Sequence, residues 1–140
     1  MNTQNVASLE ACKRLVDAGI VLETDFYWYV YNEDMCRSLI AADKAIPAPY
    51  LVNRASVRTR IGSIPTAYVP APSMAEVWRE LPETIDEYDL TCEKIFNGGM
   101  QAGYTTYDVS GLRWKVLLNA ANPTDAMIDL LIWVIHENDA

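Results

Sequence analysis

Apolar and polar positions follow a helical period at both ends of the chain. Over residues 7–18 the apolar side chains share one face and the charged ones the other, and Gly19 follows where helices often end in left-handed backbone. Near the other end, Asn122 is placed to cap a helix with Pro123 at its first position, and the apolar residues beyond them span a wide arc. We predict two helices, the second being the spine of the core.

A third helix is predicted from its terminal signals. Ser73 and Glu76 have the spacing of a capping box, and Pro82 is placed to end the helix. Between them the apolar residues recur at helical spacing. They are Met74, Val77, Trp78 and Leu81.

Side chains that alternate between the two faces with a period of two residues predict β-strands. Residues 24–31 are rich in β-forming residues, and residues 32–34 are predicted as a turn. Residues 35–40 are predicted to return from that turn as a second strand. Further along, residues 88–118 predict a three-stranded meander, because Asn97-Gly98-Gly99 and Ser110-Gly111 supply turn chemistry.

These elements predict an α+β protein in which an antiparallel β-sheet is covered by three amphipathic helices, in the order α-β-(β)-α-β-β-β-α. A length of 140 residues is typical of one domain, so we expect residues 1–140 to form a single domain. Residues 45–72 are predicted to be a Pro-rich loop and edge-strand segment within it, with a short strand at residues 56–61, because prolines exclude a long helix.

Charge and composition narrow the classes of partner. The net charge of −8 disfavours nucleic acid and anionic lipid as partners. The longest apolar run, residues 130–135, is far shorter than the ~20 residues that cross a membrane. The polar opening residues predict no secretory signal. Three scattered cysteines predict free thiols and a cytoplasmic location.

No motif for an enzyme is present in the sequence. There is no nucleophile elbow, phosphate-binding loop, zinc-protease motif, EF-hand loop or dinucleotide fingerprint. A zinc site would need all three cysteines and the lone His136 to converge by coincidence. We therefore expect no catalytic residues, no metal site and no cofactor.

Arg54, Arg58 and Arg60 form the best signal for a ligand. Arg58 and Arg60 would share one face of a strand, as a clamp for a phosphate or carboxylate requires. The same arginines also suit an edge strand, where charge prevents aggregation and pairs with nearby acids. The sequence leaves both interpretations open.

Aromatic residues suggest an interface. Tyr27, Tyr29 and Tyr31 share one face of their predicted strand, and tyrosine is enriched at protein interfaces. We expect Tyr88, Tyr104 and Tyr107 to lie near them, in the same sheet. Trp133 lies on the polar stripe of the last helix, where it is either covered by the chain or part of an interface. The alternative to an interface is that the tyrosines lie on a half-covered face of the sheet, where their β-propensity alone would place them.

Three stretches resemble small uncharacterised proteins encoded by phages and prophages, including those of gut bacteria. The matching stretches are residues 9–15 running into 25–28, residues 71–82, and residues 122–133. Their motifs are caps, core faces and a stopping proline, so the resemblance implies a fold and a bacterial host but no site residues.

Together these observations favour a non-enzymatic accessory protein of a phage or mobile element, acting on an unknown protein partner or as a homo-oligomer. The alternative is a binding protein for a small anionic ligand of the nucleotide type, which would use the arginine cluster.

Overall fold

The computed structural model describes residues 6–54, 68–95 and 99–138. The described elements follow one another along the chain in mixed helix and strand order. They are α1 (Leu9–Asp17), β1 (Phe26–Tyr29), α2 (Glu33–Ala41), β2 (Tyr50–Asn53), β3 (Tyr68–Pro70), α4 (Met74–Glu80), β4 (Thr84–Ile85), β5 (Tyr88–Lys94), β6 (Met100–Asp108), β7 (Gly111–Ala120) and α5 (Pro123–Asn138).

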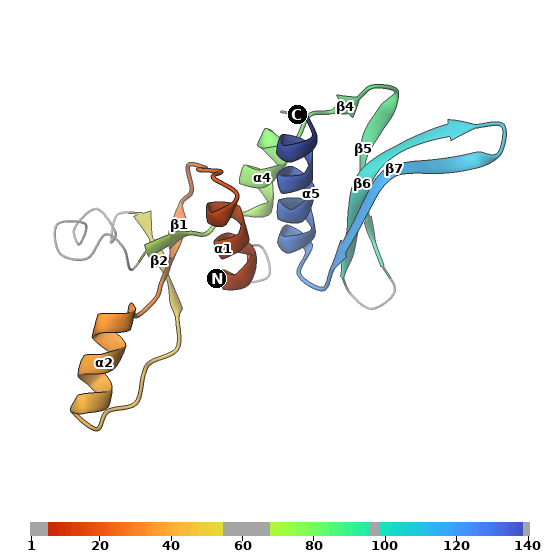
Figure 1. The fold of residues 1–140 in the computed structure, drawn as a ribbon. Helices are drawn as coiled ribbons and strands as arrows, with labels where there is room; N and C mark the ends of the chain where they lie inside the picture. Colours follow the sequence, from red (N-terminus) through yellow and green to blue (C-terminus); the bar gives the residue numbers. More distant parts are fainter. Residues whose placement is uncertain (1–5, 55–67, 96–98, 139–140) are drawn as a thin grey trace.

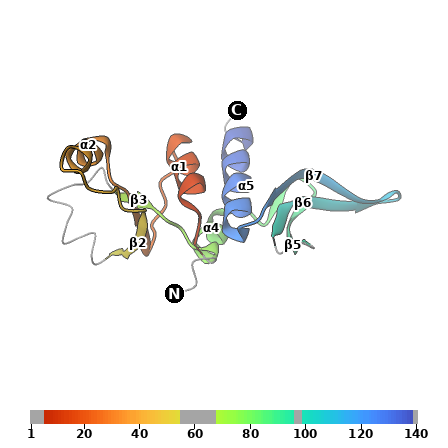
Figure 2. The ribbon, with the colours of Figure 1, turned by 90° about the horizontal axis from the view of Figure 1, so that it is seen from below.

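Helices α1, α4 and α5 form the middle of the molecule, between two antiparallel sheets (Figures 1 and 2). One sheet has the strand order β2-β1-β3, and the other has the order β4-β5-β6-β7. The α+β class is confirmed. The prediction of a single sheet is wrong, because β1 pairs with β2 and β3 instead of with the later meander.

The core is built around α5, as its apolar arc predicts. Met127, Ile128, Leu130 and Leu131 are buried on this helix. The helix begins as predicted, since the Asn122 side-chain oxygen accepts the Thr124 amide at 2.9 Å. Buried residues of α1, α4 and β6 join the same apolar cluster. The three middle helices therefore share one core with both sheets.

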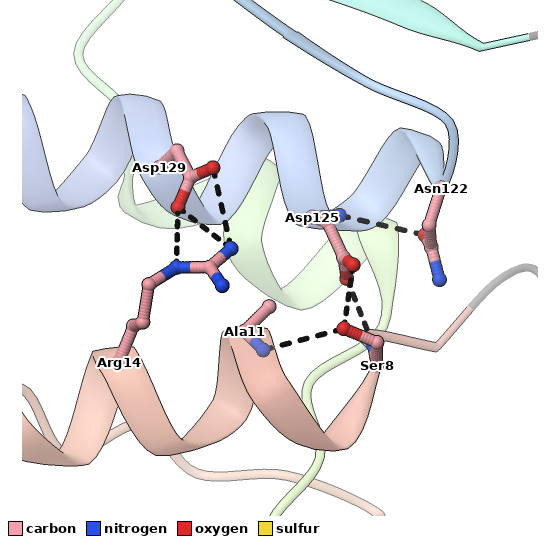
Figure 3. Close-up of polar contacts among 6 residues, drawn as sticks. All are labelled: Ser8, Ala11, Arg14, Asn122, Asp125 and Asp129. Atoms are coloured by element: carbon pink, nitrogen blue, oxygen red, sulfur yellow. Dashed lines mark hydrogen bonds and ion pairs between the residues drawn. The ribbon is translucent and has the colours of Figure 1, made fainter.

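The α1 and α5 helices lie side by side with their N-termini together, and Asp125 joins them (Figure 3). Its carboxylate accepts the Ser8 amide at 2.8 Å and the Ser8 hydroxyl at 2.6 Å. Ser8 also caps α1, because its Oγ accepts the Ala11 amide at 3.2 Å. One carboxylate thus stabilises the positive ends of two helix dipoles.

A second carboxylate, Asp129, contacts α1 on the same side of α5. Its two oxygens accept the Arg14 guanidinium at 3.0 and 3.3 Å. The two acids on the polar stripe of α5 thus both contact α1, whereas His136 at the end of the stripe is exposed.

The β2-β1-β3 sheet is small, and the proline-rich segment supplies both of its edges. β2 and β3 flank the central strand β1, and Pro70 pairs with Tyr27 at the β3 edge. Proline is tolerated there because an edge strand has one side without ladder partners. Residues 45–72 thus contribute the two edge strands β2 and β3, and the strand expected at residues 56–61 lies outside the described residues.

The β4-β5-β6-β7 sheet contains the predicted meander, and its last two strands project as a long hairpin (Figures 1 and 2). Gly103 is needed in β6, since a Cβ at this position would lie 2.0 Å from the Val116 carbonyl oxygen. Gly111 supplies the positive φ of 111° in the tight turn. The register shifts between Tyr104 and Thr105, where β7 has one extra residue.

The strand predicted at residues 35–40 is wrong, because α2 occupies this segment. Asn32 is the helix cap, its side-chain oxygen accepting the Met35 amide at 2.9 Å. Arg37 pairs with Glu33 at 2.7 Å one turn earlier. The segment predicted as a turn is thus the start of a helix, with an acidic first turn that suits the dipole.

We expect Asp125→Ala to lower the free energy of unfolding by about 2–3 kcal/mol, because the Ser8 amide and hydroxyl lose a charged acceptor. Asp129→Ala, four residues later on the same helix, is the matched control. Its ion pair with Arg14 is partly exposed, so we expect a loss under about 1 kcal/mol. Urea unfolding of both variants measures the difference, and equal losses would contradict the role of Asp125.

Candidate functional site

Arg54 lines a cleft of about 530 Å³ between the start of α4 and the chain entering β1. Its backbone amide donates to the Asp25 carbonyl at 2.8 Å, which places it at the end of the β2-β1-β3 sheet. Arg58 and Arg60 lie outside the described residues. The structure therefore places one of the three arginines at a hollow surface.

Glu76 is the best-positioned group in this cleft and is nearly buried. One carboxylate oxygen accepts the Ser73 amide at 2.8 Å, which completes the predicted capping box of α4. The other accepts the Asp25 amide at 3.0 Å. Glu76 thus ties α4 to the beginning of β1, a positioning role that its capping signal alone did not reveal.

The charges of the cleft are mixed. Arg54 and Arg79 share it with the carboxylates of Glu23, Asp25 and Glu76. Among the described residues, neither arginine has an ion-pair partner within 4.0 Å. The cleft therefore offers two available guanidinium groups, but no net excess of positive charge. The place of Arg79 in the cleft could not be predicted, since helical periodicity assigns this residue only to a polar face.

The three tyrosines of the first predicted strand, Tyr27, Tyr29 and Tyr31, lie in or next to β1 and are buried or half-buried. Tyr29 is buried at the centre of an aromatic cluster, and its ring contacts those of Tyr31, Tyr50 and Tyr68 at centroid distances of 5.2, 5.2 and 5.3 Å. Tyr50 and Tyr68 lie directly opposite Tyr29 on the two edge strands. Tyr27 is half-buried in β1.

The remaining tyrosines of the prediction lie in the other sheet, because the two sheets are separate. Tyr104 is fully buried, and its hydroxyl donates to the Pro82 carbonyl at 2.7 Å. Tyr88 lies under the Lys115 ammonium, 5.3 Å from the ring centroid. Tyr107 lies at the end of the β6–β7 hairpin and is 80% exposed. A continuous six-tyrosine face does not form.

Helix α2 carries an apolar surface that the described chain covers only in part, since Tyr31, Met35 and Leu39 are half-buried. A shallow hollow of about 360 Å³ lies beside it, which we call the α2 hollow; it is lined by Tyr31, Asp34, Met35, Ser38 and Leu39. No residue of α2 is buried. Tyr31 belongs both to the α2 hollow and to the aromatic cluster, so the two apolar features are continuous.

A second apolar surface lies at the end of the β6–β7 hairpin, at residues 107–113, which we call the hairpin tip. Tyr107, Val109 and Leu112 are all exposed there, and Val109 is fully exposed. The turn was predicted from Ser110-Gly111, but its projection from the body of the molecule is visible only in the structure (Figure 1).

Trp133 is half-buried and packs against the core, which agrees with cover by the chain itself. His136 is exposed near the end of α5. In the described part of the chain, no group of three or more His, Cys, Asp and Glu residues is placed to hold a metal ion. Within the same residues, no helix is long and apolar enough to cross a membrane.

No family model, no curated protein and no solved structure matches this chain. We therefore base the functional proposal on the cleft, the α2 hollow and the hairpin tip.

The three cysteines are free thiols in different surroundings. Cys12 is buried beside α5, and burial together with the nearby Asp125 carboxylate raises its pKa from 9.0 to about 12. Burial also raises the pKa of the Cys92 thiol. Cys36 lies half-exposed on α2. Reactivity should differ between them, since the thiolate is the reactive form.

We expect Cys36 to be alkylated first at pH 8 and Cys12 to react only on unfolding, because a pKa three units higher lowers the thiolate fraction roughly a thousandfold. Time-resolved iodoacetamide labelling followed by peptide mass spectrometry measures the order. Because folding raises the pKa of Cys12, the contribution of this thiol to the free energy of unfolding is fully present below pH 9. It is lost as the pH rises toward about 12. Early labelling of Cys12 in the native protein would contradict its burial.

Proposed function

We propose that this chain is a non-enzymatic accessory protein of a phage or mobile element that acts through protein–protein contact, with copies of itself or with another protein. The observation that carries the proposal is the exposed apolar surface of the hairpin tip, together with the open, half-buried apolar lining of the α2 hollow. Exposed apolar patches on otherwise ordinary surfaces commonly mark interaction sites. The phage setting is supported by the resemblance of residues 9–15, 71–82 and 122–133.

Polar contacts set the local backbone at these two places. Helix α2 begins at its Asn32 cap and carries the exposed Arg37–Glu33 ion pair. The hairpin turn is set by Asp108 and by the positive φ of Gly111. Partner binding would give the exposed Tyr107 and Val109 side chains a role that the turn itself does not.

We expect the purified chain to self-associate as its concentration rises, and we expect the double variant Leu39→Glu plus Val109→Asp to associate much more weakly. The charges introduced on both apolar surfaces would have to be desolvated in any contact there. Sedimentation velocity across a protein concentration series measures this, with circular dichroism to confirm folding.

Val21→Asp is the matched control, because Val21 is 87% exposed and lies in neither surface. It should associate as the unmodified chain does. If the unmodified chain stays monomeric and the double substitution also leaves its set of co-purifying proteins unchanged, the proposed function is wrong.

One observation favours the alternative, an anionic ligand of the nucleotide type. Arg54 and Arg79 line the same cleft, and neither has an ion-pair partner among the described residues. Two guanidinium groups suit a phosphate or carboxylate. The carboxylates of Glu23 and Asp25 in the same cleft oppose such binding by repulsion.

Because acids predominate in the cleft, we expect a flat thermal-shift screen across mono-, di- and cyclic nucleotides. A bound nucleotide at a hundredfold excess over its Kd would instead stabilise the fold by ~2.7 kcal/mol. Stabilisation that disappears in Arg54→Ala plus Arg79→Ala would favour the ligand function over protein contact. Arg58→Ala plus Arg60→Ala tests the other two arginines of the predicted cluster in the same way.

A further inference from the structure

The hairpin tip is folded by polar contacts that leave its apolar side chains free. The Asp108 carboxylate accepts the Ser110 amide at 2.7 Å and the Arg113 guanidinium at 3.0 Å. Asp108 thereby fixes both the turn and the start of β7. Val109 takes no part in these bonds and is fully exposed. A polar residue would serve this turn position equally well, so the apolar valine is unexplained by folding.

The α2 hollow has the opposite shape. It is concave and shallow, and Tyr31, Met35 and Leu39 supply its apolar lining. Its volume of about 360 Å³ is in the range that one compact inserted group can occupy. The hairpin tip is therefore a projecting apolar group, and the α2 hollow is an apolar surface that can receive one.

These two features lie at opposite ends of the molecule. Both views show α2 beyond the β2-β1-β3 sheet at one end and the β6–β7 hairpin extending from the other end, with α1, α4 and α5 between them (Figures 1 and 2). The hairpin tip cannot reach the α2 hollow of its own chain. A second copy can supply it.

Local charges favour this contact although the chain as a whole is acidic. A net charge of −8 makes copies repel on average, so a self-contact needs local attraction. At the hairpin tip the more exposed charge is positive, with Arg113 at 62% exposure against 30% for Asp108. The first turn of α2 has two acids, Glu33 and Asp34, for the single base Arg37. Because Asp108 pairs with Arg113, the tip adds no net charge, and its more exposed guanidinium can approach the one excess negative charge of the α2 first turn.

We propose that the hairpin tip of one copy inserts into the α2 hollow of a second copy, with Arg113 facing the acidic first turn of α2. This inference rests on the proposed function and specifies its partner as another copy of the chain. The contact joins two different surfaces, so it is heterologous and extends into a ring if the rotation closes or a filament if it does not.

Two single variants test the contact. Val109→Asp disables the hairpin tip, and Leu39→Glu disables the α2 hollow. Each variant alone should be monomeric in sedimentation velocity, because every contact needs one intact copy of each surface. Mixed in equal amounts, the two should form a dimer and nothing larger, since the dimer carries only disabled surfaces at its ends. The unmodified chain and Val21→Asp should form larger assemblies.

Other outcomes would overturn the inference and identify the alternative. If Val109→Asp still associates, the contact does not use the hairpin tip, as in pairing of two α2 surfaces. If Leu39→Glu still associates, the α2 hollow is not used, as in pairing of two tips. Both results overturn the head-to-tail contact and leave self-association as the proposed function. A mixture that stays monomeric, or an unmodified chain that never associates, also overturns it.

Charge reversal tests the proposed electrostatic contact between Arg113 and the first turn of α2. Arg113→Glu, introduced into the Leu39→Glu chain that donates the tip, should weaken the mixed dimer with Val109→Asp at least several-fold. Glu33→Lys plus Asp34→Lys in the Val109→Asp chain should restore it. Weakening without restoration would mean that Arg113 does not face the first turn of α2.

Discussion

The arrangement of the helices depends on a single carboxylate, Asp125, shared by the N-termini of α1 and α5 (Figure 3). Parallel helices place two positive dipole ends close together, which is unfavourable without a nearby anion. Asp125 supplies that charge and also accepts both hydrogen bonds offered by Ser8. Because α5 is the centre of the core and α1 contacts the β2-β1-β3 sheet, the orientation of this sheet relative to the core follows from the contact.

Each sheet is held to the helices by an aromatic side chain with one polar bond, half-buried in the case of Trp28 and fully buried in the case of Tyr104. The Trp28 indole donates to the Ala7 carbonyl at 2.9 Å and joins β1 to the start of α1. The Tyr104 hydroxyl donates to the Pro82 carbonyl and joins β6 to the segment after α4. Such side chains combine a large apolar contact with a directional bond. They fix the inner part of each sheet and leave both outer ends of the molecule without support from the core.

Sequence reasoning succeeded where structure is determined locally and failed where it depends on distant segments. The capping box of Ser73 and the Asn122 cap were predicted, because each involves residues at most three positions apart. Helix α2 was missed although Asn32 is an equally good cap, since the apolar residues after it also suit a strand. The division into two sheets depends on β1 pairing with β2 and β3, a choice between distant partners that alternation cannot make.

The candidate surfaces were only partly predictable for the same reason. Tyr31 was identified from its aromatic neighbours, but the α2 hollow requires knowing that the next segment is a helix without a buried face. Val109 gave no signal at all, because a valine in a strand pattern is ordinarily a core residue. Its exposure follows from the length of the hairpin beyond the point where α5 covers the sheet. The surfaces available for association, at α2 and the hairpin tip, thus consist of other residues than those that stabilise the core. Substitutions in the surfaces can therefore change association without unfolding the core, and the reverse also holds.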